Sequence, residues 1–211
     1  MSLGVLSRYG WGMKKPFATM AVLAAFFALP AAAAPISLAD LSAYFAGIRT
    51  AEAPFTQYNA DGTEVTGRLF MHRPGRARFE YDNSDVLVVV GGGQVAIFED
   101  LTDAQPLQYP LSVTPLDLIL GRNVSLATSD LVVDHREAED GTTRVVARDQ
   151  DRPEAGELTL VFADAPLRLV QWMTRNEYGE TVVVALGDFI FGQDYSNFLF
   201  SPTFEAEQRS R

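Results

Sequence analysis

Few side chains in this 211-residue chain have the type and spacing that catalysis requires. The chain has no cysteine, and its two histidines, His72 and His135, lie far apart in the sequence. A metal site needs several His, Cys or carboxylate ligands, and a nucleophilic triad needs a histidine beside a hydroxyl or thiol. We therefore expect no metal site, no cofactor and no enzyme activity. We expect His72 on the polar face of a strand and His135 at the surface.

Carboxylates stand close together in three places: Glu99 with Asp100, Glu139 with Asp140, and Asp149 with Asp151. All three places are predicted strand ends or loops with other polar residues nearby. Catalytic carboxylates need apolar surroundings or a close partner that separates their pKa values. We therefore interpret these residues as solvated turn residues.

A run of three glycines, Gly91 to Gly93, could be mistaken for a phosphate-binding loop. Such a loop needs a helix after it, so that backbone amides converge on the anion. The residues that follow, "QVAIFED", have the pattern of a strand. The glycines therefore indicate a turn between two strands.

The chain opens with the pattern of a secretory signal peptide, residues 1–33. Lys14 and Lys15 precede an apolar run that ends in small residues, and cleavage fits best after Ala33. Because the basic segment normally begins the peptide, Met13 is the better start, and residues 1–12 can be an overextended start. The apolar run is shorter than the roughly 20 residues of a membrane span, so a retained anchor is the weaker alternative.

Residues 34–211 are of a length that suits one domain. They contain 14 arginines, no lysine and 27 acidic side chains, a formal charge of −13. Such a charge repels nucleic acid and anionic lipid headgroups. Without cysteine the exported chain must fold by packing alone, and it cannot carry a lipid on a cysteine. We therefore predict a soluble periplasmic protein that does not bind nucleic acid.

Two helices are predicted. The segment "ISLADLSAYFAGIRT" predicts an amphipathic helix, because Ser37 and Asp40 form a capping box and apolar residues recur every three or four positions. The segment "SVTPLDLILGRN" predicts a short apolar helix that is capped by Thr114 and Asp117 and terminated by Gly121.

Most of the remaining chain alternates apolar and polar residues in short runs between turn residues. These runs predict ten strands, at 55–58, 65–71, 77–81, 86–90, 94–98, 131–136, 143–148, 158–162, 167–174 and 181–191. There is no strand–helix alternation and no internal repeat. We therefore predict a mainly β fold, in which one antiparallel sheet curls around itself.

The predicted domain is rich in large apolar side chains, with 11 phenylalanines and Trp172 after residue 33. A curled sheet with about this many strands can enclose more volume than its own side chains fill, so an apolar ligand could lie inside. The same residues could instead make a dry core. The composition alone leaves both possibilities open.

The segment "APFTQYNADGTEVTGRLFMHRPGRARFEY" resembles the periplasmic outer-membrane lipoprotein carrier family (LolA-type). After the initial amphipathic helix, the residues that carry the resemblance are Phe55 and Gln57, Gly67, Arg73 with Pro74, and Phe79 with Tyr81. The later segments "TPLDLIL", "LRLVQWMTRNEYGE" and "NFLFSP" match the family in type and order. The resemblance thus spans essentially all of residues 34–211.

The resemblance implies an incomplete, unclosed antiparallel β-barrel covered by short helices, the LolA/LolB-like lipoprotein localisation fold. It implies that Arg73 is a gate residue, which reaches across the barrel mouth and hydrogen-bonds the lid helices in the empty state. A guanidinium suits that role because its five donors can satisfy several carbonyls at once. The other nearby arginines, Arg68, Arg76 and Arg78, are predicted on the outer face, paired with carboxylates and contributing little each.

The resemblance also implies that the apolar interior receives acyl chains. The residues that we expect to line the cavity and the lid are Leu41, Phe45, Ile48, Phe55, Leu69, Met71, Phe79, Tyr81, Leu116, Ile119, Leu120, Phe162 and Trp172.

The function implied by the resemblance is a monomeric periplasmic carrier that shuttles lipoproteins from the inner to the outer membrane. Its implied partners are acylated lipoproteins as cargo, an ATP-driven transporter of the inner membrane as donor, and an outer-membrane acceptor. Alternatives with the same fold are a glycolipid carrier and a lipoprotein-sensing module, although a sensor would need a further domain. A small hydrolase is a third hypothesis, and it lacks a nucleophile–base pair.

Overall fold

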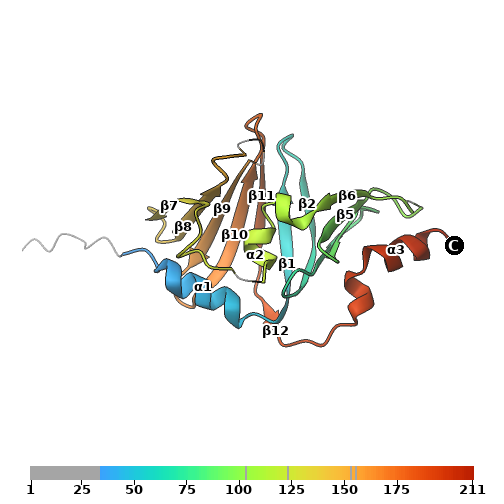
Figure 1. Cartoon of the computed structure of the whole chain (residues 1–211), viewed down its shortest axis with the longest axis horizontal. Helices are drawn as coiled ribbons and strands as arrows, with labels where there is room; N and C mark the ends of the chain where they lie inside the picture. Colours follow the sequence, from blue (N-terminus) through green and yellow to red (C-terminus); the bar gives the residue numbers. More distant parts are fainter. Residues whose placement is uncertain (1–33, 103, 123, 153, 155) are drawn as a thin grey trace, which may run out of the picture. The chain divides into compact units, whose positions relative to one another are not determined.

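A computed structural model describes residues 34–102, 104–122, 124–152, 154 and 156–211 (Figure 1). The predicted signal peptide and its cleavage site lie outside these residues. The described residues between 34 and 211 belong to one compact unit. No helix in the described part of the chain is long and apolar enough to cross a bilayer.

The described residues form one large antiparallel sheet and a few short helices. The helices are α1 (Leu38–Gly47), α2 (Asp117–Leu120) and α3 (Pro202–Arg209), with two 3-10 turns, η1 (Leu111–Val113) and η3 (Asn197–Phe200). The strands are β1 (Thr50–Tyr58), β2 (Glu64–His72), β3 (Ala77–Tyr81), β4 (Leu87–Gly91), β5 (Gln94–Phe98), β6 (Leu107–Pro110), β7 (Val132–Glu137), β8 (Thr143–Arg148), β9 (Glu157–Ala163), β10 (Arg168–Arg175), β11 (Thr181–Leu186) and β12 (Ile190–Phe191).

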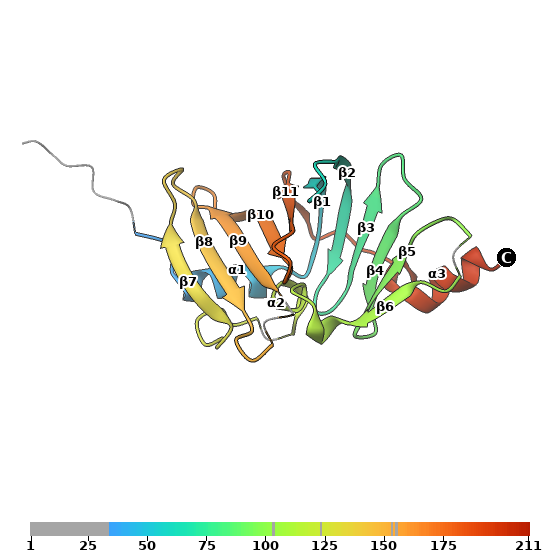
Figure 2. The ribbon, with the colours of Figure 1, turned by 90° about the horizontal axis from the view of Figure 1, so that it is seen from above.

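The sheet is curled but not closed. Its strand order is β6-β5-β4-β3-β2-β1-β11-β10-β9-β8-β7, so β6 and β7 form its two edges (Figure 2). The central strand β1 pairs with β2 along its whole length, and on its other side it pairs first with β12 and then with β11. The prediction of a mainly β, unclosed antiparallel barrel with short helices is confirmed.

This strand order explains why a helix lies over the open side of the sheet. Strands β6 and β7 are consecutive in the sequence but lie at opposite edges, so the connecting residues 111–131 must cross from one edge to the other. The crossing segment carries η1 and α2 (Figures 1 and 2). Helix α1 packs into the same apolar cluster as α2 on the concave side.

The two predicted helices differ in how well the sequence defines them. Helix α1 begins as predicted, because the Ser37 hydroxyl accepts a hydrogen bond from the Asp40 amide at 3.1 Å. The predicted cap of α2 is wrong. Thr114 ends the η1 turn instead, its hydroxyl donates to the Leu111 carbonyl at 2.8 Å, and α2 starts later without a side-chain cap.

The predicted strand at 181–191 is interrupted. Pro54 in the neighbouring strand β1 has no N–H to donate, and the Gly187 amide bonds to the Pro54 carbonyl at 2.9 Å. A Cβ at Gly187 would lie 2.7 Å from the Pro54 ring, so the backbones approach closely there. The ladder therefore divides into β11 and β12. Strand β1 also starts earlier than predicted, at Thr50.

Strand β6 and helix α3 were not predicted, and neither were the 3-10 turns η1 and η3. Strand β6 is exposed at every position, so its sequence has no apolar alternation. Helix α3 follows Ser201, whose hydroxyl accepts from the Phe204 amide at 3.2 Å, and has a proline in its first turn. This serine–proline start is a helix signal that could have been recognised in the sequence.

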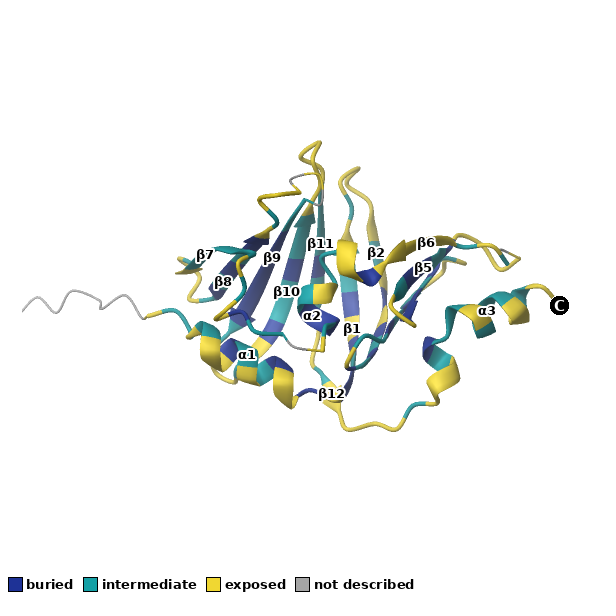
Figure 3. Ribbon diagram, in the orientation of Figure 1, coloured by how far each residue is buried: buried dark blue, intermediate teal, exposed yellow. Residues whose placement is uncertain are grey.

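Most of the buried apolar side chains belong to one of two clusters. Figure 3 marks the buried residues along the ribbon. The large cluster lies between the concave side of the sheet and helices α1 and α2. The small cluster consists of Leu87, Val89, Ala96 and Phe98 of β4 and β5, with Ala206 of α3 packed against it. Strands β4 and β5 are thus covered on both faces, and α3 covers the outer one.

Candidate binding site

The thirteen side chains that we expected around a cavity all lie in the large apolar cluster. Tyr81 and Leu116 are half-buried. The buried members are Leu41, Phe45, Ile48, Phe55, Leu69, Met71, Phe79, Ile119, Leu120, Phe162 and Trp172. In this conformation, side chains of the two helices pack against the concave side of the sheet.

Aromatic rings line the sheet beneath the helices. Phe79 packs edge-to-face against Phe55 and Trp172, with ring centroids 5.9 and 6.1 Å apart. Phe55 packs in the same way against Tyr81 at 5.3 Å. Burial raises the pKa of Tyr81 to about 12, and its hydroxyl donates to the Gln57 side chain at 3.1 Å. Gln57 thus satisfies the polar end of an otherwise apolar wall.

Helix α1 is fixed along its length by polar contacts. At its start, the Ile36 amide donates to the Thr143 hydroxyl at 2.9 Å, and the His135 imidazole bonds to the Ile36 carbonyl at 2.8 Å. Further along, the Tyr44 hydroxyl accepts from the Leu169 amide at 3.2 Å. His135, which was predicted at the surface, is therefore half-buried with a structural partner.

Arg73 lies where the two covering helices end. Its side chain is buried, Nη1 donates to the Phe45 carbonyl of α1, and Nη2 donates to the Gly121 carbonyl after α2 at 3.0 Å. Its guanidinium carbon lies 5.6 Å from the centre of the Phe45 ring. One planar fork thus joins both helices to the β2–β3 turn, which a single ammonium could not do in this geometry.

The charge of Arg73 is compensated by carbonyl groups. Within the described residues it forms no ion pair, and its buried Nε has no hydrogen-bond partner. Burial lowers the pKa of Arg73 from its usual value. Carbonyls at helix C-termini carry partial negative charge, which favours a cation there. The contact is thus favourable while both helices are in place.

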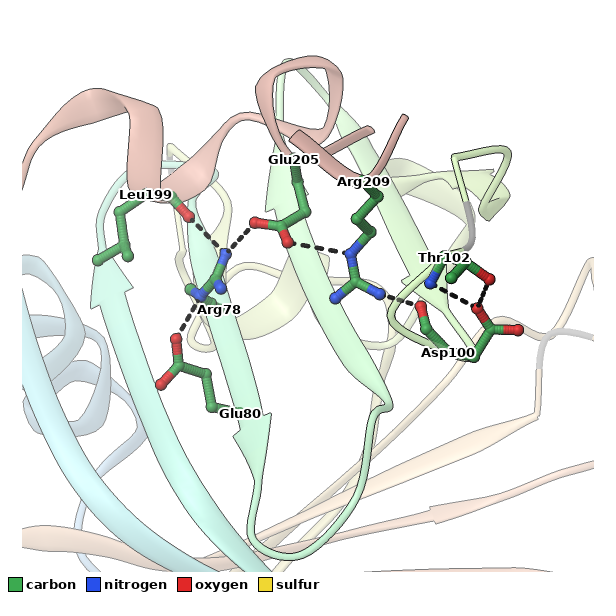
Figure 4. Close-up of polar contacts among 7 residues, drawn as sticks. All are labelled: Arg78, Glu80, Asp100, Thr102, Leu199, Glu205 and Arg209. Carbon is green, nitrogen blue, oxygen red and sulfur yellow. Dashed lines mark hydrogen bonds and ion pairs between the residues drawn. The ribbon is translucent and has the colours of Figure 1, made fainter. Parts of the chain in front are cut away.

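The neighbouring arginines face the opposite side of the sheet, as their alternation predicts. Arg68 pairs with Glu52 at 3.4 Å. Arg78 pairs with Glu80 at 2.6 Å and with Glu205 of α3 at 3.0 Å (Figure 4). Arg76 departs from the prediction, because its Nη1 donates to the Asn197 amide oxygen at 2.7 Å and not to a carboxylate.

The C-terminal residues 194–209 cover the outer face of β1 to β5, and we call them the C-terminal strap. Sequence reasoning did not identify their role. Figure 4 shows Glu205 between Arg78 and Arg209, with Arg209 also donating to the Asp100 carbonyl. The guanidinium of Arg209 lies 4.7 Å from the Phe98 ring centre. The sequence could not reveal that Glu205 pairs with both arginines, because Arg78 is far from Glu205 in the sequence and meets it only in the folded chain.

The other residues considered for chemistry have structural surroundings. His72 ends β2 on the outer face, and burial together with the nearby Arg76 and Arg49 charges lowers its pKa. Asp140 and Asp149 accept hydrogen bonds within their own turns. In the described part of the chain, no group of three or more His, Cys, Asp or Glu side chains could hold a metal.

In the described part of the chain, two short helices thus cover an apolar concave surface. The family model of the outer membrane lipoprotein carrier protein LolA matches residues 46–203. The chain belongs to this family. The LolA type is a family of non-enzymatic binding proteins.

Curated relatives of the LolA family match part of the chain. The outer-membrane lipoprotein carrier protein of Chromobacterium violaceum is 33% identical over 115 residues, 51% of this chain and 55% of the relative. The protein of the same name from Coxiella burnetii is 30% identical over 91 residues, 39% of this chain and 43% of the relative. The matched region thus spans about half the length of these relatives.

Among solved structures, a LolA superfamily protein from Nitrosomonas europaea overlays with a TM-score of 0.44 at 11% identity. The overlay covers 81% of this chain and 98% of that protein.

Proposed function

We propose that this protein is a periplasmic carrier that shelters the acyl chains of lipoproteins and moves them from the inner to the outer membrane. The observation that carries the proposal is the arrangement of two short helices over an apolar concave sheet, joined by the buried guanidinium of Arg73. Membership of the LolA family supports it.

The free energy of exposing an acyl chain to water and the free energy of removing the lid side chains from the core are of similar size. An acyl chain of about 15 methylenes costs on the order of 12 kcal/mol to expose to water, at roughly 0.8 kcal/mol per methylene. Opening the lid removes five buried side chains from the core: Leu41, Phe45, Ile48, Ile119 and Leu120. At about 1.5–3 kcal/mol each, they are together worth on the order of 10 kcal/mol. Acyl chains can therefore replace the lid side chains at little net cost.

Because these large terms nearly cancel, a small polar term decides which state is populated. Hydrogen bonds from a charged donor contribute about 1.5–3 kcal/mol each. The two bonds of Arg73 exist only while the helices cover the sheet. Arg73 therefore favours the closed, empty state and opposes retention of cargo, which is what a carrier needs at the point of delivery.

The proposed partners follow from the same energetics. Extraction of acyl chains from a membrane requires work that this chain cannot supply, so we propose an ATP-driven transporter of the inner membrane as donor. Delivery would go to an outer-membrane acceptor. The proposed location is the periplasm, where a carrier between the two membranes must act.

Mass spectrometry of the protein isolated from a periplasm tests the cargo. Acylated lipoprotein bound to the native chain is the expected result. Free glycolipid in its place would contradict the lipoprotein proposal and favour a glycolipid carrier. Neither lipid, in preparations never exposed to detergent, would contradict an acyl-chain carrier altogether.

The gate is tested by Arg73→Leu. We expect this variant to hold cargo in the open state and to release it poorly to outer-membrane acceptor vesicles. Release at the native rate would contradict a gating role for Arg73.

A further inference from the structure

The β2–β3 turn, residues 72–76, is held from two sides. On the lid side, Arg73 donates to both helix ends and the Gly75 amide donates to the Leu120 carbonyl at 2.7 Å. On the outer side, the turn meets the C-terminal strap. There Arg76 donates to Asn197 at 2.7 Å, and the His72 ring packs edge-to-face on Phe200 with centroids 5.8 Å apart.

Arg76 connects the strap directly to the backbone next to Arg73. Its Nε donates to the His72 carbonyl at 3.3 Å, and its own carbonyl accepts from the His72 amide at 3.0 Å. Arg76, which Asn197 binds, is thus also the residue that closes the turn by its hydrogen bonds to the His72 backbone. A change at Asn197 reaches Arg73 through this turn.

The strap is anchored independently of the turn. Tyr195 donates to Glu52 at 2.9 Å, and Glu205 accepts from Arg78 and Arg209 at 3.0 Å each (Figure 4). A Cβ at Gly91 would lie 1.9 Å from the Phe200 carbonyl oxygen, so the strap backbone lies directly on the sheet there. With these anchors the strap can act as a fixed support for the turn.

We propose that Asn197 and Arg76 are positioning residues for Arg73. By fixing the turn from outside, the strap keeps the guanidinium aimed at the two helix-end carbonyls. An unsupported turn would have to be ordered each time the lid closes, and that loss of conformational freedom would weaken the closed state. The inference rests on the proposed gating function of Arg73. It goes beyond that function by assigning the outer face of the sheet a part in closing the lid.

The test is a double-mutant cycle on lid opening in the protein without cargo. The chain has no cysteine, so E64C and D117C give two unique positions for spin labels, both exposed, one on β2 and one on α2. Pulsed EPR distances give the open fraction. We expect Asn197→Ala to raise it about 3- to 10-fold in the native background and not at all in the Arg73→Leu background.

Two strap variants provide controls. Asn197→Asp keeps an oxygen acceptor for Arg76 and should leave the open fraction at the native value. Phe198→Ala removes a ring that is 63% exposed and packs on Phe204 within the strap, and it should also leave the open fraction unchanged.

The outcomes separate the inference from the function on which it rests. If Asn197→Ala opens the lid equally in both backgrounds, or only lowers the melting temperature, the strap is a general stabiliser and the inference is overturned. If Arg73→Leu itself leaves the open fraction unchanged, the gating function fails, whatever Asn197→Ala does.

Discussion

Arg73 is a buried cation whose partners are main-chain carbonyls of two different helices. Arg73→Lys keeps the charge but replaces the planar fork by one ammonium group, which cannot reach both carbonyls. Losing one charged hydrogen bond of about 1.5–3 kcal/mol should raise the open fraction roughly 10- to 100-fold. EPR distances in the unloaded protein would measure this. An open fraction equal to the native one would show that bridging two helices is unimportant.

Glu205 is the acidic centre of the strap. Burial opposes its ionisation, but hydrogen bonds and charges from Arg78 and Arg209 outweigh burial, so the pKa of Glu205 lies below its usual value. A group whose folded-state pKa is depressed stabilises the fold above its unfolded-state pKa. That contribution is lost as pH falls through the folded-state value.

We therefore expect Glu205→Gln to lower the free energy of unfolding by roughly 1–2 kcal/mol at pH 7. The difference from the native chain should shrink as pH falls below about 4.5, the ordinary glutamate range. Urea unfolding of both proteins between pH 3 and 7 measures it. Glu207→Gln, an exposed change two residues away, should show no such difference.

At the residue level, sequence reasoning placed apolar side chains better than polar partners. The thirteen predicted lining residues belong to one cluster because strand and helix periodicity determine which side faces the core. The partner of Arg76 could not be predicted, because Asn197 lies 121 positions away in a segment whose path over the sheet has no local signal.

The C-terminal strap depends on a close approach to the sheet at Gly91 of β4. A Cβ there would overlap the Phe200 carbonyl, while the strand conformation itself accepts alanine. Gly91→Ala should therefore displace the strap and leave the sheet in place, at a cost of about 1–3 kcal/mol typical of overpacking. Hydrogen exchange should show lost protection in residues 195–209 and retained protection in β4.

Gly47 provides the matched control for that experiment. It ends α1, and a Cβ there meets nothing within 4 Å. Gly47→Ala should leave strap protection and stability unchanged or slightly improved. Equal effects of the two variants would contradict the role assigned to the close approach at Gly91.

Elements with a strong local pattern were predictable and those defined by topology were not. The capping box of α1 lies within four residues, so it is visible in the sequence. The division between β11 and β12 depends on Pro54 of the neighbouring strand β1, which is far away in the sequence. The crossing of residues 111–131 over the open side follows only when the strand order is known.

Several exposed acidic side chains lie together at one end of the sheet. Antiparallel pairing brings the turns around residues 59–63, 82–86 and 176–180 to the end of the sheet away from Arg73. Asp61, Asp85, Glu177 and Glu180 lie in these turns and are exposed. With a formal charge of −13 in residues 34–211, the protein should not sediment with vesicles of anionic phospholipid at low salt.

Reversing part of this charge tests the effect. A variant with Glu64→Lys, Asp85→Lys and Glu177→Lys changes the formal charge from −13 to −7. It should be repelled less by such vesicles than the native chain at low ionic strength, and the difference should disappear at about 0.5 M salt. Binding of the native chain under the same conditions would show that its charge does not keep it off membranes.

The two unpaired edges of the sheet, β6 and β7, have a consequence for the range of cargo that the proposed carrier could bind. The circumference of a closed barrel is set by its strand number and stagger. A sheet with two free edges can instead curl more tightly or more loosely while its inter-strand hydrogen bonds stay formed. In the proposed carrier, the volume enclosed by the sheet could then increase with the volume of the bound acyl chains. Lipids with two or with three acyl chains would then bind to the same sheet without any change in its strand pairing.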